Sequence, residues 1–181
     1  MGFLSRLFGR DDAATTDARR IYAKLMSQSR LPNFYGEGRF ADDYDGRIDV
    51  LTLHIAAILS NLNRFGQNGE RLGQALFDEM KDDFEIALRE EALSDASVKK
   101  RIQPMISLFY DRVKKYVEAL NQPDAKQALE LAFSETLHSD GGVVSFSKAI
   151  AAYQMDFDQA LSSCSLGQIA LTEFDFPSLM N

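Results

Sequence analysis

The sequence of 181 residues contains one cysteine, two histidines and no tryptophan. A single cysteine, Cys164, excludes both an intramolecular disulfide and a metal site built from cysteines alone. No apolar run reaches the ~18–20 residues that a membrane-spanning helix needs. The first residues also lack the continuous apolar core of a secretion signal. These absences leave a globular protein whose apolar core contains many of its 13 phenylalanines.

The formal net charge is −7, and it is unevenly distributed along the chain. Residues 1–10 contain Arg6 and Arg10 and no acidic residue, whereas residues 121–181 contain two lysines and eight acidic residues. An acidic protein is a poor general ligand for nucleic acid, and we expect no DNA partner.

Apolar residues recur with helical spacing along most of the chain, which predicts an all-α fold. We expect one globular bundle of about six helices with a short amphipathic N-terminal extension (1–12), a helical domain (13–165) and an extended C-terminal tail (166–181) packed on it. Asp45 and Asn68 are the predicted N-caps of the second and third helices. Pro104 falls inside the fourth, which is either kinked there or divided. The six predicted helices cover residues 13–29, 46–63, 69–91, 94–120, 123–138 and 145–161.

The first twelve residues form a short basic amphipathic helix in this interpretation. Apolar residues share one face and arginines another, a pattern typical of helices that dock on anionic lipid. The alternative is a frayed terminus whose apolar side chains pack on the domain. The residues expected to contact a membrane are Phe3, Leu4, Arg6, Leu7, Phe8 and Arg10.

An acidic cluster at residues 78–83 suggests one enzymatic alternative. Carboxylates one helical turn apart can hold Mg²⁺ against a diphosphate, as in helical prenyl-diphosphate enzymes. Such enzymes need a second acidic motif on a facing helix, and the candidate at residues 42–45 belongs more naturally to a turn. We therefore expect a solvated helix face, no catalytic residue, no metal and no cofactor.

The fourth predicted helix carries a basic stripe. Arg101, Arg112 and Lys115 fall on one face of a continuous helix because 11 and 14 residues are close to whole numbers of turns. Such a stripe suits an acidic protein, ribosomal RNA or lipid headgroups. It also suits the acidic C-terminal third of the same chain, and the sequence leaves both interpretations open.

Several short motifs lie within residues 20–120. They comprise Tyr22, Arg30, Pro32, Tyr35, Asp45, Gly46, Arg47, Ile48, Asp49, His54, Asp82, Asp83, Leu88, Arg89, Glu90, Asp95, Val98, Tyr110, Arg112 and Tyr116. Together these motifs resemble those of the ubiquinol-cytochrome c chaperone family. The departures are Asp111, where the family has glycine, and residues 91–94, where it often has a glycine-containing turn.

The resemblance implies an assembly chaperone for the cytochrome bc1 complex rather than an enzyme. Its expected partner is cytochrome b or another bc1 subunit, with a ribosome, the membrane surface and a small partner protein as further expectations. A bacterial protein of this kind would be cytoplasmic, peripheral on the inner face of the cytoplasmic membrane. The alternative function is a peripheral membrane adaptor for another client.

The resemblance also divides the candidate site residues into two groups. We expect contacts with the client from Arg47, Arg89, Arg101, Arg112 and Lys115, and structural roles for Asp45, Gly46, Asp49, His54, Asp82, Asp95, Tyr110 and Tyr116. In the structural interpretation of the motif at residues 45–47, Asp45 caps a helix, Gly46 permits close packing, and Arg47 pairs with Asp82 or Glu90. His54 should be a hydrogen-bonded core residue oriented by Asp49 or Asp111.

Overall fold

The computed structural model describes residues 4–90, 95–137 and 143–179, and it leaves the side chains of residues 4–12, 95–96 and 143–144 undescribed. Within these ranges the regular structure is helical apart from one isolated bridge between Tyr35 and Phe40. The all-α prediction is confirmed. The elements are α1 (Leu4–Ser29), η1 (Pro32–Phe34), α2 (Tyr44–Leu62), η2 (Asn63–Phe65), α3 (Gly66–Glu90), α4 (Asp95–Leu120), α5 (Ala125–Thr136), α6 (Val143–Ser162) and α7 (Leu166–Ala170).

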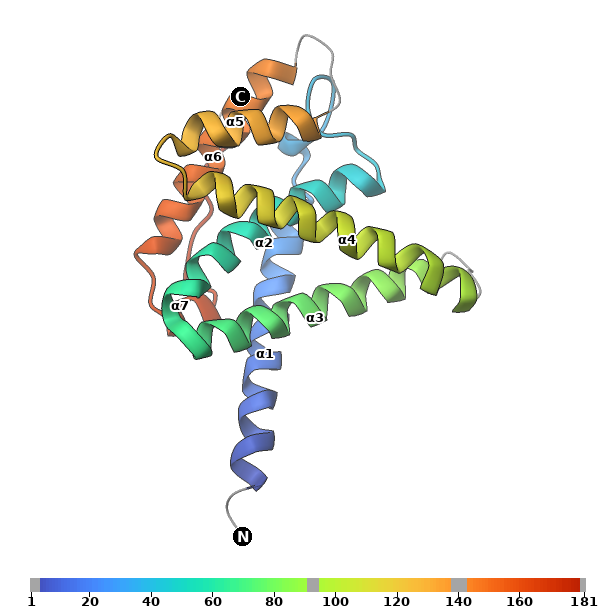
Figure 1. The fold of residues 1–181 in the computed structure, drawn as a ribbon, viewed down its shortest axis with the longest axis vertical. Coiled ribbons are helices and arrows are strands. Elements are labelled where there is room, and N and C mark those ends of the chain that lie inside the picture. The colour runs from blue at the N-terminus through green and yellow to red at the C-terminus, as the bar shows by residue number, and fades with distance from the viewer. Residues whose placement is uncertain (1–3, 91–94, 138–142, 180–181) are drawn as a thin grey trace.

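Helix α2 is the centre of the bundle (Figure 1). It packs against α1, α3, α4 and α6. Nearly all of its residues from Asp49 to Ile58 are buried, as its apolar sequence predicts. A helix that is apolar on every side needs neighbours on every side, and this requirement explains its central place.

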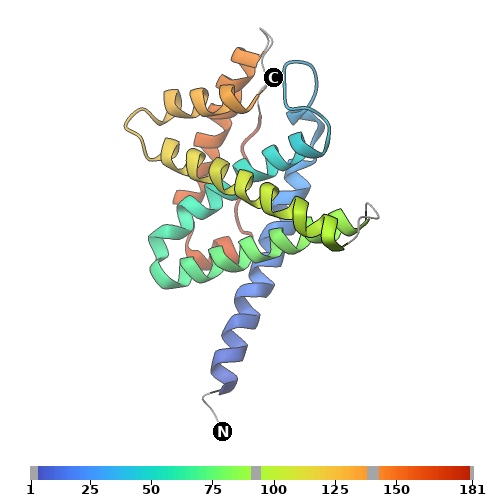
Figure 2. The ribbon, with the colours of Figure 1, turned by 45° about the vertical axis from the view of Figure 1, so that its right-hand side comes forward.

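Helices α3 and α4 run side by side away from the bundle and form an arm (Figures 1 and 2). The turn before α3 is tight, because a Cβ atom on Gly69 would lie 1.9 Å from the carbonyl oxygen of Leu62. Helix α3 starts at Gly66, so the prediction that Asn68 caps it is wrong. Pro104 lies inside α4, which continues through it from Asp95 to Leu120.

Helix α1 is continuous over 26 residues, and its N-terminal turns extend beyond the rest of the molecule (Figures 1 and 2). The part of the predicted N-terminal extension that the structure describes, residues 4–12, is therefore the beginning of α1 rather than a separate helix. Farther along, α1 packs against α3, where Arg19 Nε lies 3.1 Å from Glu79 Oε2.

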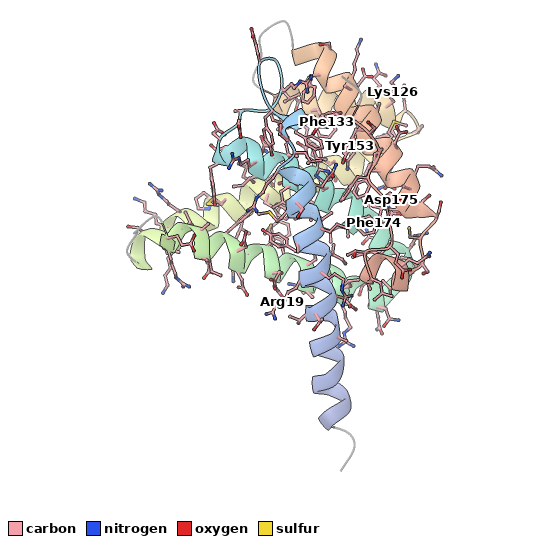
Figure 3. The ribbon with its side chains drawn as sticks, turned by 180° about the vertical axis from the view of Figure 1, so that it is seen from behind. Arg19, Lys126, Phe133, Tyr153, Phe174 and Asp175 are labelled. Atoms are coloured by element: carbon pink, nitrogen blue, oxygen red, sulfur yellow. The ribbon has the colours of Figure 1, made fainter. Side chains whose placement is uncertain are left out.

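The C-terminal segment returns along α1 and is held there by lysine and arginine side chains. Lys24 Nζ donates to the carbonyl of Thr172 at 2.9 Å and to that of Phe174, and it lies 4.3 Å from the centroid of the Phe174 ring. Figure 3 shows Phe174 and Tyr153 beside α1. The tail was predicted to be extended throughout, but its first part forms α7, which begins with a capping box between Ser165 and Gln168.

Candidate functional site

Close packing fixes the turn that leads into α2. A Cβ atom on Gly46 would lie 2.0 Å from the carbonyl oxygen of Ala41, so only glycine fits, as predicted. The N-cap is Asp43, whose carboxylate accepts a hydrogen bond from the Gly46 amide at 2.9 Å. The prediction that Asp45 caps this helix is wrong, because the helix starts at Tyr44, two residues before the predicted start at Gly46.

Arg47 lies in the first turns of α2 and remains on the surface. Its guanidinium pairs with Asp42 at 2.9 Å, and both side chains are more than half exposed. The predicted partners were Asp82 and Glu90, which lie on α3. An exposed pair of this kind is weak, so Arg47 can exchange Asp42 for another acidic partner at little cost.

A buried ion pair joins α4 to α2. Arg112 on α4 pairs with Asp49 on α2, and the two side chains are only 18% and 9% exposed. Burial lowers the pKa of the Arg112 guanidinium, and the nearby Asp45 and Tyr116 oppose that effect. Arg112 therefore does not lie on the predicted surface stripe, and its charge is used inside the fold.

The two motif tyrosines of α4 also make packing contacts. Tyr116 is fully buried, its hydroxyl lies 3.0 Å from Thr136 Oγ1, and its ring lies 4.7 Å from that of Phe133. Tyr110 is half exposed and packs on Phe77 of α3, with ring centroids 4.7 Å apart. These contacts fasten α4 to α5 on one side and to α3 on the other.

His54 is completely buried in the core of α2. Its Nδ1 lies 2.7 Å from the Val50 carbonyl and its Nε2 lies 2.8 Å from the Tyr153 hydroxyl. Because a carbonyl can only accept, Nδ1 carries the proton and Nε2 accepts from Tyr153. Burial lowers the pKa of His54 to about 4, so the ring is neutral. The core location is as predicted, but the expected partners Asp49 and Asp111 do not orient the ring.

Two pockets open beside Tyr44, the first residue of α2, whose side chain is 40% exposed. The α1–α2–α3 pocket has a volume of about 300 Å³, and the α2–α3–α4 pocket has a volume of about 540 Å³. The first is lined by Arg30, Arg47, Ile48, Leu51, Ile86 and Glu90, among others. The second is lined by Asp45, Leu88, Lys100, Arg101, Pro104 and Met105, among others. We call Tyr44 and these two pockets the Tyr44 surface.

The Tyr44 surface combines an apolar floor with a charged rim. Ile86 of α3 is 53% exposed and lines the α1–α2–α3 pocket. Arg30, Arg47, Lys100 and Arg101 contribute positive charge, and the described lining residues of both pockets include no histidine or cysteine. Such a surface can bind a peptide segment that carries apolar and acidic side chains.

The sequence-predicted client residues separate in the structure. Arg47 and Arg101 line the Tyr44 surface, whereas Arg89 pairs with Glu85 on the exposed side of α3. Lys115 pairs with Glu135 of α5, and Arg112 is internal. Tyr44 and Ile86 were not predicted, although an aromatic residue at a helix start and an isoleucine outside the apolar stripe of α3 are visible in the sequence.

The remaining motif residues lie on α3 and at the ends of helices. Asp82 is exposed, and its neighbour Asp83 accepts a hydrogen bond of 2.8 Å from the Tyr22 hydroxyl, which ties α3 to α1. Asp95 is the first residue of α4, and its side chain lies outside the described part. The same holds for Phe3 and for the side chains of Leu4, Arg6, Leu7, Phe8 and Arg10.

Acidic side chains of the cluster on α3 contact neighbouring polar and basic side chains. Asp78 accepts a hydrogen bond from Gln74, and Glu79 pairs with Arg19. Within the described residues, no group of three or more histidine, cysteine or acidic side chains could hold a metal ion. In the same residues, no helix is both long and apolar enough to cross a bilayer.

Two comparisons find similar proteins. A family model described as ubiquinol-cytochrome c chaperone matches residues 37–176, which include the Tyr44 turn and the Arg112–Asp49 pair. The crystal structure of the Cbp3 homolog from Brucella abortus is similar, with a TM-score of 0.80 and 26% sequence identity over 98% of each chain. No curated protein matches the sequence.

Proposed function

The chain belongs to the ubiquinol-cytochrome c chaperone family, and we propose that it binds cytochrome b through the Tyr44 surface while the bc1 complex is assembled. Family membership makes it an assembly chaperone for that complex, with a bc1-related protein as its partner.

The observation that carries the proposal is the convergence of motif residues on one surface. Tyr22, Arg30 and Asp83 approach it from α1 and α3, and the turn at residues 45–47 forms its centre. The buried contacts of Gly46 and Asp49 hold that turn in place, while Arg47 remains exposed. The fold thus fixes the position of an exposed apolar and cationic surface, as a binding site requires.

The same chemistry argues for binding rather than catalysis. Four cationic side chains line the two pockets and can pair with carboxylates of a client, next to the three acidic side chains of Asp45, Asp83 and Glu90, and the pocket floors are apolar. Exposed apolar side chains next to such charges are typical of protein interaction sites. A newly made membrane subunit that has not yet met its partners exposes apolar segments of this kind.

A second part of the proposal concerns the membrane. The N-terminal turns of α1 extend beyond the bundle (Figure 2), and residues 1–10 combine two phenylalanines and two leucines with Arg6 and Arg10 and contain no acidic residue. We propose that this end of α1 docks on anionic lipid at the inner face of the cytoplasmic membrane, next to the inserted client.

Site-specific photo-crosslinking tests the client contact. A photoreactive amino acid at Ile86 or at Tyr44 should form an adduct with cytochrome b in membranes that are assembling the bc1 complex. The same amino acid at Gln159, an exposed position on α6 that lines neither pocket, is the matched control. Adducts of equal yield at all three positions would contradict the proposal.

Complementation tests whether the contact matters for assembly. In a strain that lacks this gene, an Arg47→Glu/Arg101→Glu variant should fail to restore the b- and c-type haem signals of the bc1 complex in a redox difference spectrum. A Lys114→Glu/Lys126→Glu variant changes the charge equally at exposed positions away from the Tyr44 surface and should restore them. If the first variant restores the signals at wild-type protein level, the Tyr44 surface is not the client site.

A further inference from the structure

A groove lies between α4 and α5, outside the Tyr44 surface. Its volume is about 820 Å³, and Glu118 and Ala119 of α4 face Ala128 and Leu131 of α5 across it. Leu131 is 61% exposed, more than any other large apolar side chain in the described residues. We call this surface the α4–α5 groove.

The outer face of α4 extends the groove. Leu108, Asp111, Lys115 and Glu118 are spaced by three or four residues and therefore lie in one row along α4. Leu108 is 47% exposed and lies two turns before Lys115. The row from Leu108 to Glu118 is about 15 Å long, which is the length of a helix of about 10 residues. Two exposed leucines and a concave surface of this length suit an amphipathic helix laid along α4.

The charge of the groove is mainly negative. Its lining contains four carboxylates, from Glu118, Asp124, Glu130 and Glu135, and two lysines, of which Lys115 already pairs with Glu135. Glu118 makes only a long, exposed contact of 3.8 Å with Lys114, and Glu130 makes no ion pair with any described side chain. The complementary partner is therefore positively charged as well as apolar.

We propose that the α4–α5 groove binds a basic amphipathic segment of the client that lies next to the membrane. This inference rests on the proposed function, because a membrane-protein client supplies such a segment. Cytoplasmic segments near transmembrane helices carry an excess of lysine and arginine. The groove lining has more acidic than basic side chains, whereas the lining of the Tyr44 surface has four cationic and three acidic ones, so the two surfaces bind different parts of one client.

A binding experiment with a defined probe tests the groove in the purified full-length protein. The probe is a fluorescently labelled amphipathic peptide with leucines on one helix face and lysines on the other, and a second peptide has glutamates in place of the lysines. Fluorescence anisotropy should show binding of the lysine peptide only. A Glu118→Lys/Glu130→Lys variant should bind it at least about tenfold more weakly.

The matched control is an Asp156→Lys/Asp175→Lys variant, which has the same net charge change at exposed positions outside the groove. It should bind the lysine peptide within about twofold of the wild type, and circular dichroism with thermal melting should show that both variants are folded. Equal weakening in both variants, or equal binding of the two peptides, would mean that the attraction is general and would overturn the inference.

Assembly separates this inference from the proposed function. The Glu118→Lys/Glu130→Lys variant should lower the bc1 haem signals in cells, while photo-crosslinking from Ile86 to cytochrome b persists. If the haem signals stay normal although the variant no longer binds the peptide, the groove is not used by the client, and the Tyr44 surface keeps its proposed role. If a photoreactive amino acid at Ile86 in the otherwise wild-type protein forms no adduct with cytochrome b, the proposed function itself is contradicted.

Discussion

Arg112 of α4 and Asp49 of α2 form an ion pair inside the bundle, at the point where the arm formed by α3 and α4 meets the central helix. A charge this poorly exposed is stable only with its partner, so the pair specifies which face of α4 contacts α2. Because α4 lines both the Tyr44 surface and the α4–α5 groove, the ion pair helps to position both surfaces.

Removing one member of this pair should be costly. Arg112→Met leaves Asp49 buried without its partner and should lower the free energy of unfolding by about 3 kcal/mol, the low end of the usual range because Arg112 keeps some exposure. Urea denaturation measures this change. The double variant Arg112→Met/Asp49→Leu should recover most of the loss, whereas Lys114→Met, 75% exposed on the same helix, should change stability by less than about 0.5 kcal/mol. A single variant as stable as the wild type would show that the pair does not hold α4 to α2.

Gly46→Ala should disturb the turn before α2. The new Cβ would lie 2.0 Å from a backbone oxygen, so the backbone of residues 41–46 has to move. We expect a loss of about 2 kcal/mol or more in unfolding free energy, measured by thermal or urea denaturation. Gly167→Ala is the control, because its Cβ would meet only the Ser165 hydroxyl at 3.9 Å. Similar melting temperatures for both variants would contradict the predicted clash.

His54 should make the protein less stable in acid. Its pKa is about 4 in the folded state and near the ordinary histidine value of 6.5 when unfolded, so between these values the unfolded chain binds the extra proton. Stability is therefore complete above pH 6.5 and falls as the pH drops toward 4, by roughly 3 kcal/mol. Urea denaturation at several pH values measures the slope.

Two comparisons make the acid prediction specific to His54. A His54→Gln variant should be less stable at neutral pH, because it loses the ring that Tyr153 contacts, but its stability should depend less on pH between 6.5 and 4. Asp158 acts in the opposite direction, since burial raises its carboxyl pKa. An unchanged pH slope in His54→Gln would assign the acid sensitivity to other groups.

Lys24→Met should release the C-terminal segment from α1. The substitution removes two hydrogen bonds to the carbonyls of Thr172 and Phe174 and the contact with the Phe174 ring. Hydrogen bonds from a charged donor contribute about 1.5–3 kcal/mol. Hydrogen–deuterium exchange in peptides from residues 171–179 should become faster, while exchange in α2 stays slow. Lys126→Met, at an exposed position on α5, is the control.

The N-terminal end of α1 should bind anionic vesicles. Each arginine near an anionic surface contributes about 1 kcal/mol, so Arg6→Glu/Arg10→Glu should weaken co-sedimentation with phosphatidylglycerol vesicles by more than about tenfold. A Lys126→Glu/Lys148→Glu variant, with the same net charge change, should bind as the wild type does. Equal binding of the wild type to neutral phosphatidylcholine vesicles would show that charge does not drive the contact.

The elements that depend on local sequence were predictable. The apolar run of residues 50–62 predicts the buried central helix, and the glycine at position 46 predicts a close approach of two backbones. The start of α2 was misplaced because Asp43 and Asp45 are both good N-caps, and only the backbone conformation at Asp43 distinguishes them. The break expected after residue 12 is absent because residues 9–13 contain no proline to end a helix.

The pairings between distant residues were not predictable from one sequence. Helical spacing puts Arg112 in line with Arg101 and Lys115, but an acidic residue 63 positions earlier, Asp49, draws its side chain into the interior. The Tyr44 surface depends on the packing of four helices, α1 to α4, and exposure of Ile86 follows only from the way α3 packs. Periodicity reports which residues share a face of a helix, not which neighbour covers that face.

The continuity of α1 affects how the domain would be oriented at a membrane. A single helix of 26 residues is about 39 Å long, and its last residue, Ser29, lies 3.2 Å from His54 in the core. If the first turns of α1 bind a membrane, the continuous helix would therefore fix the tilt of the whole domain, which a flexible linker would not do. The length and direction of α1 would then determine the angle of the domain and its height above the membrane when it contacts a newly inserted subunit.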